Sequence, residues 1–465
     1  AAMPSLKRNL GVAGGIAISL AVMGPSMSVS LNPQAIADQV GAAVPTTFVV
    51  ALVPLALIVG SFVLLSRRRG SAGSVFGLVG AEIGPRSGTA AGVWLVSAYV
   101  AATAITALSF GIFTLTLLQE LGWTTAPSWL PIALAIIVLP VTSFLSGRTI
   151  RALGIALLVL EGLTMTAIVA VTAITFVRLE TTGGPQGQAV DWSAFRLEGV
   201  STGALALGLT FALLSSAGFE GSATAGEEAR DPRKDIPRAL IWTTALTSAF
   251  FIVVTAVAVW AFGESPSQLA AFSASGSLPA DMANAYVGDG MGDFITLGGA
   301  ISSFACMIGA QVAGGRIIYA FARDGVATAP LAQLSPHSTP ARASLVVGAA
   351  GTCFVLFALL VTGAQPFSAF ELTSDVAGVV FIGAYAAAAA AAFKVLVQSE
   401  RGRFWAVLPA LAIVVLVMLL FLQVFPIPSG WELIAPVLGL GVLAAGAAFG
   451  RLRGDRARDA FEVRA

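Results

Sequence analysis

Long apolar runs, separated by short polar connections, dominate the pattern of this chain. A helix needs about 20 mostly apolar residues to cross a bilayer, and lipid offers no partner to unpaired backbone groups, so such runs predict helices. We predict twelve membrane-spanning helices, at residues 10–36, 45–66, 88–119, 129–147, 152–178, 201–227, 237–262, 293–321, 343–362, 373–396, 402–424 and 432–450. The first run is too long for the apolar region of a cleavable signal peptide, so we expect a membrane helix there.

Composition supports a membrane protein and narrows its chemistry. Hydrophobic residues make up 57% of the 465 positions and charged residues 11%, whereas soluble domains contain about 45–50% and about 25%. The net charge of +1 gives no reason to expect a nucleic-acid partner. Cys306 and Cys353 lie apart in apolar runs, and His337 is the single histidine. We therefore expect no disulfide framework, no histidine-based metal site, no cofactor and no enzyme activity.

The basic residues predict the orientation of the chain, because cytoplasmic loops of membrane proteins are enriched in lysine and arginine. If the N-terminus is placed in the cytoplasm, the connections on that side contain all of the 25 basic residues except Arg178 and Arg196. The opposite connections contain acidic residues, namely Glu120, Asp191, Glu264, Asp281 and Asp289. We therefore predict an even number of spans in the plasma (inner) membrane, with both termini cytoplasmic.

Two of the predicted spans contain residues that interrupt a helix. In the first, Gly24 precedes Pro25, which lacks a backbone N–H and clashes with the preceding turn. In the sixth, residues 213–226 place Phe219 and Glu220 between two glycines. The two spans are five helices apart, as expected for an inverted repeat of five plus five helices with a site between two discontinuous helices. A proline kink with small-residue packing is the alternative.

Three stretches of the sequence contain motifs of a known family. The longest, GFEGSATAGEEARDPRKDIPRAL at 218–240, is similar to a signature that connects helices 6 and 7. The stretch RRRGSAGSVFGLVGAEIGPRSGTAAGVWLV at 67–96 is similar to the connection of helices 2 and 3, and GGRIIYAFARDGVATAPLAQL at 314–334 to the end of helix 8. With the twelve predicted spans, the chain resembles the amino acid–polyamine–organocation (APC) superfamily of transporters over nearly its whole length.

This resemblance implies an all-α integral membrane protein of the leucine-transporter fold, with 12 transmembrane helices of which helices 1 and 6 are discontinuous. The implied division is 1–178 for the N-terminal segment and first five-helix repeat, 179–400 for an extracellular loop and the second repeat, 401–450 for helices 11 and 12, and 451–465 for a basic cytoplasmic tail. It also implies secondary active transport of a small-molecule substrate across a lipid bilayer. We expect proton-coupled import of an amino acid or amine. Sodium coupling or exchange is the alternative within the fold, and a channel or substrate-gated sensor is the alternative outside it.

The resemblance places the substrate site between the two interruptions. The residues expected to line it are Gly24, Pro25, Ser26, Met27, Ser28, Tyr99, Ser215, Ser216, Ala217, Gly218, Phe219 and Cys306. Many relatives have a Gly-Ser-Gly-like triplet at the first interruption, whose N–H groups hold the substrate carboxylate. Here Pro25 removes one donor and Met27 is bulky, so the solute need not be an ordinary α-amino acid. For Tyr99, Phe219 and Cys306, plain helix packing is the alternative.

Four polar residues are candidates for ion coupling. Glu161 is the only ionisable residue inside the fifth predicted span, where several relatives have a lysine, and such a residue is costly in lipid. Glu220 lies at the second interruption, where relatives commonly have an acidic residue. The structural alternatives are a hydrogen bond to a neighbouring helix for Glu161 and capping of exposed N–H groups for Glu220. Ser302 and Ser303 would complete an oxygen cage for sodium, although paired serines also occur in ordinary membrane helices.

A small-residue face in the last predicted span bears on the oligomeric state. Gly446 and Gly450 are spaced by one helical turn, a pattern that favours close contact between membrane helices. We expect a monomer or a homodimer, with this face as the candidate contact.

Overall fold

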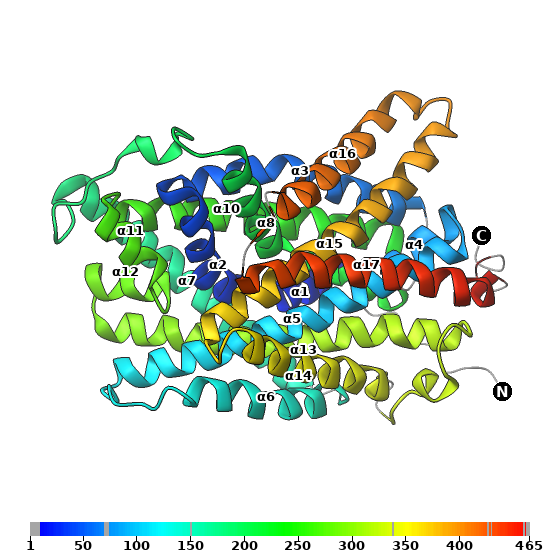
Figure 1. The fold of residues 1–465 in the computed structure, drawn as a ribbon, viewed down its shortest axis with the longest axis horizontal. Coiled ribbons are helices and arrows are strands. Elements are labelled where there is room, and N and C mark those ends of the chain that lie inside the picture. Colours follow the sequence, from blue (N-terminus) through cyan, green and yellow to red (C-terminus); the bar gives the residue numbers. More distant parts are fainter. Residues whose placement is uncertain are drawn as a thin grey trace.

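The computed structural model describes residues 10–68, 74–148, 151–336, 339–425, 427–428, 430–458 and 461. His337 and the basic residues Lys7, Arg8, Arg69 and Arg464 lie outside these ranges. The described chain is helical, with one isolated backbone bridge between Leu10 and Ala229. Figure 1 shows the long helices lying roughly parallel in one bundle. The predicted all-helical fold is confirmed.

The helices of the first half of the chain are α1 (Val12–Met23), α2 (Pro25–Val40), α3 (Val44–Arg68), α4 (Ser74–Glu82), α5 (Pro85–Glu120), α6 (Leu130–Ser146), α7 (Arg151–Thr181) and α8 (Thr202–Ser216). Those of the second half are α9 (Gly221–Thr224), α10 (Pro232–Phe262), α11 (Pro266–Ser273), α12 (Leu278–Tyr286), α13 (Asp289–Arg323), α14 (Ala341–Val361), α15 (Pro366–Val397), α16 (Val407–Val424) and α17 (Ile434–Arg453).

Within the described part of the chain, 9 helical stretches are long and apolar enough to cross a membrane. The first of them, Val12–Arg68, comprises α1 to α3. Two further apolar helices, α6 and α8, are shorter than the rest. At the centre of the bundle, α5 packs along both α13 and α15.

The start of one helix and the presence of another differ from the prediction. The seventh span was expected to begin at Pro237, but α10 begins at Pro232 and contains Pro237. The apolar run indicates which part of the helix suits lipid, and it does not indicate where the helix begins. Pro232 is favourable at the first helical position, because the N–H of that position has no partner in the helix. The helix α4 was not predicted, since its 9 residues are too few for a span.

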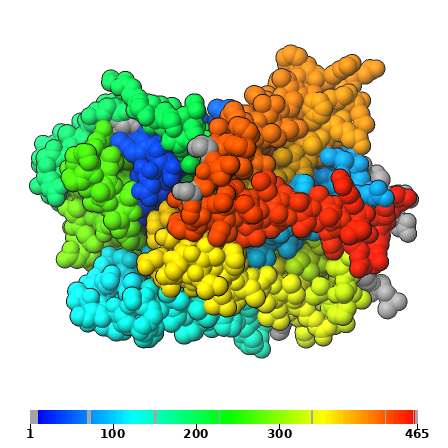
Figure 2. Space-filling view, in the orientation of Figure 1, coloured from blue at the N-terminus to red at the C-terminus, as the bar shows by residue number. Residues whose placement is uncertain are grey.

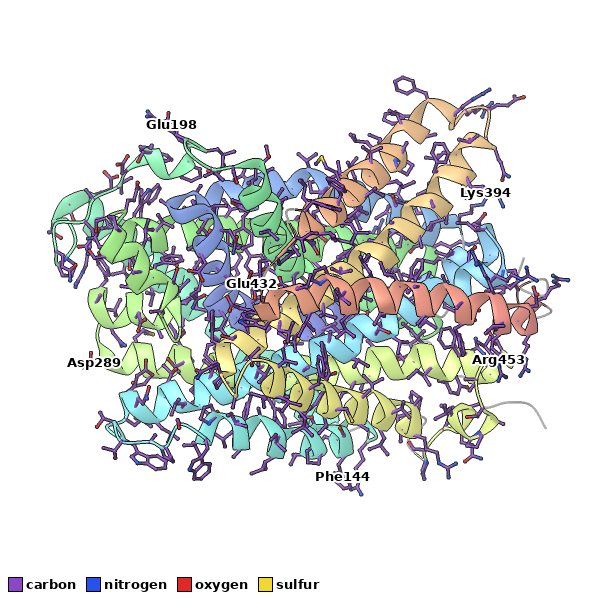
Figure 3. The ribbon with its side chains drawn as sticks, in the orientation of Figure 1. Phe144, Glu198, Asp289, Lys394, Glu432 and Arg453 are labelled. Atoms are coloured by element: carbon purple, nitrogen blue, oxygen red, sulfur yellow. The ribbon has the colours of Figure 1, made fainter. Side chains whose placement is uncertain are left out.

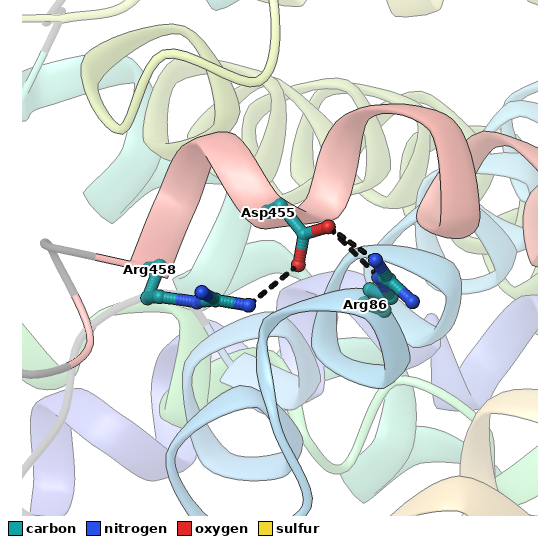
Figure 4. A network of polar contacts seen from close by, with 3 residues as sticks. All are labelled: Arg86, Asp455 and Arg458. Atoms are coloured by element: carbon teal, nitrogen blue, oxygen red, sulfur yellow. Dashed lines mark hydrogen bonds and ion pairs between the residues drawn. The ribbon is translucent and has the colours of Figure 1, made fainter.

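Two basic and two acidic residues lie at opposite ends of the bundle. Figure 3 shows Lys394 and Arg453 at one end and Glu198 and Asp289 at the other. At the basic end, Asp455 accepts a hydrogen bond from Nε of Arg86 at 3.0 Å and one from Arg458 at 3.2 Å (Figure 4). These contacts hold the end of α17 against the start of α5. This arrangement agrees with the expected orientation of the chain in the membrane. The orientation itself stays a prediction.

The small-residue face of α17 packs inside the chain. Figure 2 shows α17 lying flat against the rest of the bundle. A Cβ atom on Gly446 would lie 2.4 Å from Nε1 of Trp94, and one on Gly450 would lie 2.5 Å from the backbone oxygen of Arg86. Both neighbours belong to α5. The close helix contact that this pattern favours is therefore made with α5, and these two glycines are not open to a second copy.

Candidate functional site

A single residue separates α1 from α2. Gly24 has a φ of 55° and a ψ of 64°, a left-handed conformation that favours glycine. Pro25 is the first residue of α2, where its missing N–H costs no hydrogen bond. The next N–H groups, those of Ser26 and Met27, have no acceptor within the helix itself, as at every helix start.

The second interruption lies directly against the first. The helix α8 ends at Ser216 and α9 begins at Gly221, with turns between them. Gly218 in this segment has a φ of 103°, and a Cβ on it would lie 3.0 Å from the backbone nitrogen of Met23. The close approach requires glycine, because any larger residue would contact the end of α1.

Side chains that the sequence analysis did not single out bind the two interruptions together. Ser19 of α1 donates a hydrogen bond to the carbonyl of Phe219 at 2.6 Å and accepts one from the N–H of Ser222 at 3.1 Å. Asn32 of α2 donates through Nδ2 to the hydroxyl of Ser215 at the end of α8, at 2.7 Å. Both halves of the first interrupted segment are therefore bonded to the second.

Glu220 is fully buried at the centre of this contact. Its Oε1 accepts a hydrogen bond from the hydroxyl of Tyr99 at 3.0 Å. Its Oε2 accepts one from Tyr385 at 2.9 Å and one from the N–H of Gly218 at 3.0 Å. The carboxylate thus links α5, α15 and the second interruption. Tyr385 was not predicted, although a buried tyrosine in an alanine-rich span of a chain with 4 tyrosines was an available signal.

Phe219 lies in aromatic packing rather than at a cavity wall. Its ring centroid is 5.4 Å from that of Phe62 and 5.6 Å from that of Tyr385, and its side chain is fully buried. The structure therefore places it as the packing alternative describes.

Glu161 of α7 reaches the start of α2. Its Oε1 accepts a hydrogen bond from the N–H of Ser26 at 2.9 Å. Its Oε2 is buried and has no hydrogen-bond partner among the described residues. The N–H of Met27 donates to the hydroxyl oxygen of Ser302 at 3.3 Å. Helices α7 and α13 thus supply the acceptors for the first free N–H groups of α2, as the structural alternative for Glu161 describes.

The other two candidate residues of α13, Ser303 and Cys306, form hydrogen bonds in different directions. Ser303 donates to the carbonyl of Gly299 in its own helix at 2.9 Å. Cys306 donates through its thiol to the carbonyl of Val22, near the end of α1, at 2.8 Å. Of the two serines considered for sodium, only Ser302 is hydrogen-bonded to the first interruption among the described contacts.

A cavity of about 690 Å³ lies between α1, α7 and α13. Its lining includes Gly24, Glu161 and Ser302, and also Arg148, which follows α6, and Arg316, which lies about two turns before the end of α13. A second cavity of about 30 Å³ has room for little more than a water molecule. The predicted residues that line the second cavity are Met27, Ser28, Tyr99, Ala217, Gly218 and Cys306. Those in neither lining are Pro25, Ser26, Ser215, Ser216 and Phe219.

Two short helices cover the opposite end of α2. The amide of Gln34 in α2 donates to the carbonyl of Ser275, between α11 and α12, at 3.1 Å. Ser275 in turn donates to the carboxylate of Asp281 at 2.6 Å. Burial raises the pKa of this carboxyl. The interruption at Gly24 is thus lined by the cavity, and the far end of α2 is covered by α11 and α12.

A bundle of apolar helices with two abutting interruptions around buried carboxylates defines the class of membrane transporters. The family model described as amino acid permease matches residues 11–442, so the chain belongs to the amino acid permease family. The resemblance to the APC superfamily is thereby confirmed. Members of this family are multi-pass membrane transporters of small molecules and not enzymes.

Two curated relatives match part of the chain. An uncharacterized transporter of Mycobacterium bovis is 32% identical over 247 residues, which cover 52% of this chain and 50% of that protein. The branched-chain amino acid permease BcaP of Lactococcus lactis is 28% identical over 215 residues, covering 44% of this chain and 43% of BcaP. The chain therefore matches about half the length of these relatives.

Two solved transporters share the fold over nearly the whole chain. A manganese transporter of Eremococcus coleocola has a TM-score of 0.57 at 14% identity, covering 98% of both chains. MhsT in complex with L-phenylalanine has a TM-score of 0.56 at 18% identity, covering 89% of this chain and 99% of MhsT. At these identities the likeness establishes the fold alone, that of the leucine-transporter group.

Proposed function

We propose that this protein is a secondary active transporter of the plasma (inner) membrane that imports an amino acid or an amine together with protons. The observation that carries the proposal is the contact between the two interruptions, the first of which lines the 690 Å³ cavity at Gly24. Discontinuous helices that meet at mid-membrane depth offer backbone groups and buried carboxylates to a solute. Alternating access then exposes this site first to one side and then to the other.

The proposed architecture has twelve spans. It takes α1–α2 as discontinuous helix 1 and α8–α9 as discontinuous helix 6, with α4, α11 and α12 as connections. The repeats then comprise residues 1–178 and 179–400, followed by helices 11 and 12 at 401–450 and a cytoplasmic tail at 451–465. An even number of spans agrees with the single basic end of the bundle.

We assign proton coupling to Glu220 and Glu161. Both carboxylates are buried, and each accepts a hydrogen bond from the segment at an interruption, namely Gly218 for Glu220 and Ser26 for Glu161. Gaining or losing a proton would change the bonds that hold the interruptions. Sodium bound near Ser302 and Ser303 is the second candidate, because Ser302 already contacts the start of α2.

Uptake into proteoliposomes tests the proposal. With an inward proton gradient and no sodium, a labelled amino acid or amine should accumulate above its external concentration, and a protonophore should abolish the accumulation. Strict dependence on sodium would contradict proton coupling in favour of the serine site. A flux that does not saturate as the solute concentration rises would contradict carrier-mediated transport and favour a channel.

A further inference from the structure

The backbone donors at the start of α2 are already in use. A helix start ordinarily offers its first N–H groups to an anion. Here Pro25 has no N–H, Ser26 donates to Glu161 at 2.9 Å, and Met27 donates to Ser302 at 3.3 Å. The next N–H, of Ser28, bonds to the carbonyl of Gly24 at 2.8 Å. No backbone N–H of this turn remains for a substrate carboxylate unless Glu161 or Ser302 withdraws, and the hydroxyl of Ser26 is its one side-chain donor without a partner among the described residues.

Hydrogen-bond acceptors gather at the same place. Oε2 of Glu161 is buried without a partner among the described residues. The carbonyls of Val22 and Met23 at the end of α1 each accept one side-chain hydrogen bond and retain a second lone pair. The end of α1 also presents the negative end of its helix dipole. This combination attracts a cation and repels a carboxylate.

Among the described residues, no basic side chain forms an ion pair with Glu161. Of the residues lining the large cavity, only Arg148 and Arg316 are basic. Arg316 lies about 21 Å along α13 from Ser302 at 1.5 Å per residue, and it is paired with Glu228 at 2.7 Å. Arg148 lies over the ring of Phe144, 4.0 Å from its centroid. A buried carboxylate without a counter-ion is costly, so a bound cation at this point would be favourable.

The rest of the cavity suits an apolar body. Its walls between Glu161 and the basic end are mainly aliphatic, and include Ala17, Leu157, Leu158, Ile308 and Val312. The volume of about 690 Å³ exceeds that of a small alkyl or aryl group. A ligand with a charged head at Glu161 and an apolar body toward the basic end would match both features.

We propose that Glu161 is the counter-ion for the ammonium group of the substrate, and that the substrate is an amine with an apolar body and no carboxylate. This inference rests on the proposed function and narrows its substrate class. In it, Glu161 stays ionised and acts on specificity in two ways: it attracts the ammonium group, and it occupies the N–H of Ser26 that would otherwise bind a carboxylate. The coupled proton is then carried by Glu220 alone.

Matched pairs of ligands test the inference on the purified full chain. Phenethylamine is compared with phenylalanine, and isopentylamine with leucine, since each pair differs by one carboxylate. Thermal shift and calorimetry should detect binding of the amines and not of the amino acids. Equal or tighter binding of the amino acids would overturn the inference while leaving the proposed function intact. If no amine and no amino acid binds or is taken up, the proposed function and this inference both fail.

A variant pair locates the effect. Glu161→Gln should weaken binding of the amine by about 30-fold or more, as expected when one partner of a buried charge pair is removed. Glu180→Gln, an exposed position on the same helix, should leave the affinity unchanged. Unchanged affinity in Glu161→Gln would contradict the assigned role. The ligand pairs test the wild-type chain, so the inference remains testable if this variant does not fold.

Discussion

Glu220 is a buried carboxylate whose partners are hydrogen-bond donors rather than a cation. Two tyrosines and a backbone N–H donate to it from α5, α15 and the second interruption. Hydrogen bonds to a charged group are stronger than neutral ones, and losing one leaves a buried group unsatisfied. The protonation state of this carboxylate is therefore linked to the relative positions of three elements, which is the physical basis of its proposed coupling role.

Glu220→Gln separates coupling from folding. The amide keeps one acceptor oxygen and loses the other, so we expect a loss of stability of about 1–3 kcal/mol. Solute binding should persist, whereas accumulation driven by a proton gradient should cease. Tyr385→Phe is the control, because it removes one donor and leaves the carboxylate to titrate. Gradient-driven accumulation at the wild-type level in Glu220→Gln would leave only a structural role for this residue.

Ser19→Ala tests the bond between the two interruptions. The variant removes the partner of the Phe219 carbonyl and of the Ser222 N–H, so stability should fall by about 1–3 kcal/mol. Ser109→Ala is the matched control, because this buried hydroxyl only contacts a carbonyl of its own helix. Thermal unfolding of both purified variants gives the comparison, and equal midpoints would show that the Ser19 bonds do not stabilise the contact.

Sequence reasoning found some of these residues and missed others for a definite reason. Glu161 and Glu220 are detectable because a carboxylate in an apolar run is costly and so unusual. Ser19 and Asn32 are harder to detect, because a neutral polar side chain is less costly in an apolar run than a charged one. Tyr385 had only the weaker signal of a tyrosine in an alanine-rich span. Their importance comes from partners far along the chain, such as Ser215 for Asn32, and only packing reveals which pairs meet.

At the scale of the element, the interruption at Gly24 combines three local preferences. The left-handed conformation favours glycine, the following proline favours the first helical position, and α1 ends with the N–H of Gly24 bonded to Leu20. The Gly-Pro pair made this boundary predictable. The boundary of α10 was not, because a charged segment extends the helix beyond its apolar run.

Gly24→Ala should impair transport more than folding. A side chain at a φ of 55° costs about 1–3 kcal/mol, and its Cβ would lie 3.1 Å from that of Cys306. Gly60→Ala is the matched control, since this helical glycine has open space around it and alanine there should be neutral or stabilising by about 0.5–1 kcal/mol. Uptake rates and thermal midpoints would be measured for both. Wild-type uptake by Gly24→Ala would argue against a constrained break at this position.

At the scale of the whole molecule, the separation of charge predicts how the bundle lies in the membrane. Basic residues at one end should face the cytoplasm, where positive loops are retained. The lining of the 690 Å³ cavity includes Arg148 and Arg316 of that end, so in the predicted orientation the cavity joins Glu161 to the cytoplasmic side. The orientation followed from the sequence, whereas the cavity depends on how α1, α7 and α13 pack.

Cysteine labelling in intact cells tests this orientation. Cys306 is buried, so Cys353→Ala gives a background with no exposed thiol among the described residues. In that background, Glu198→Cys should react with a membrane-impermeant maleimide, and Arg453→Cys should react only after the cells are opened. The reverse pattern would invert the proposed topology and the direction from which the cavity opens.

Counterflow tests the central claim most directly, namely that a solute site between the two interruptions alternates between the two sides. Proteoliposomes loaded with an unlabelled solute that the protein takes up are diluted into a trace of the labelled compound. The labelled solute should accumulate transiently above equilibrium, with Gly60→Ala behaving as wild type and Gly24→Ala much reduced. Measurable flux of the labelled solute that approaches equilibrium without any overshoot would contradict alternating access and favour a channel.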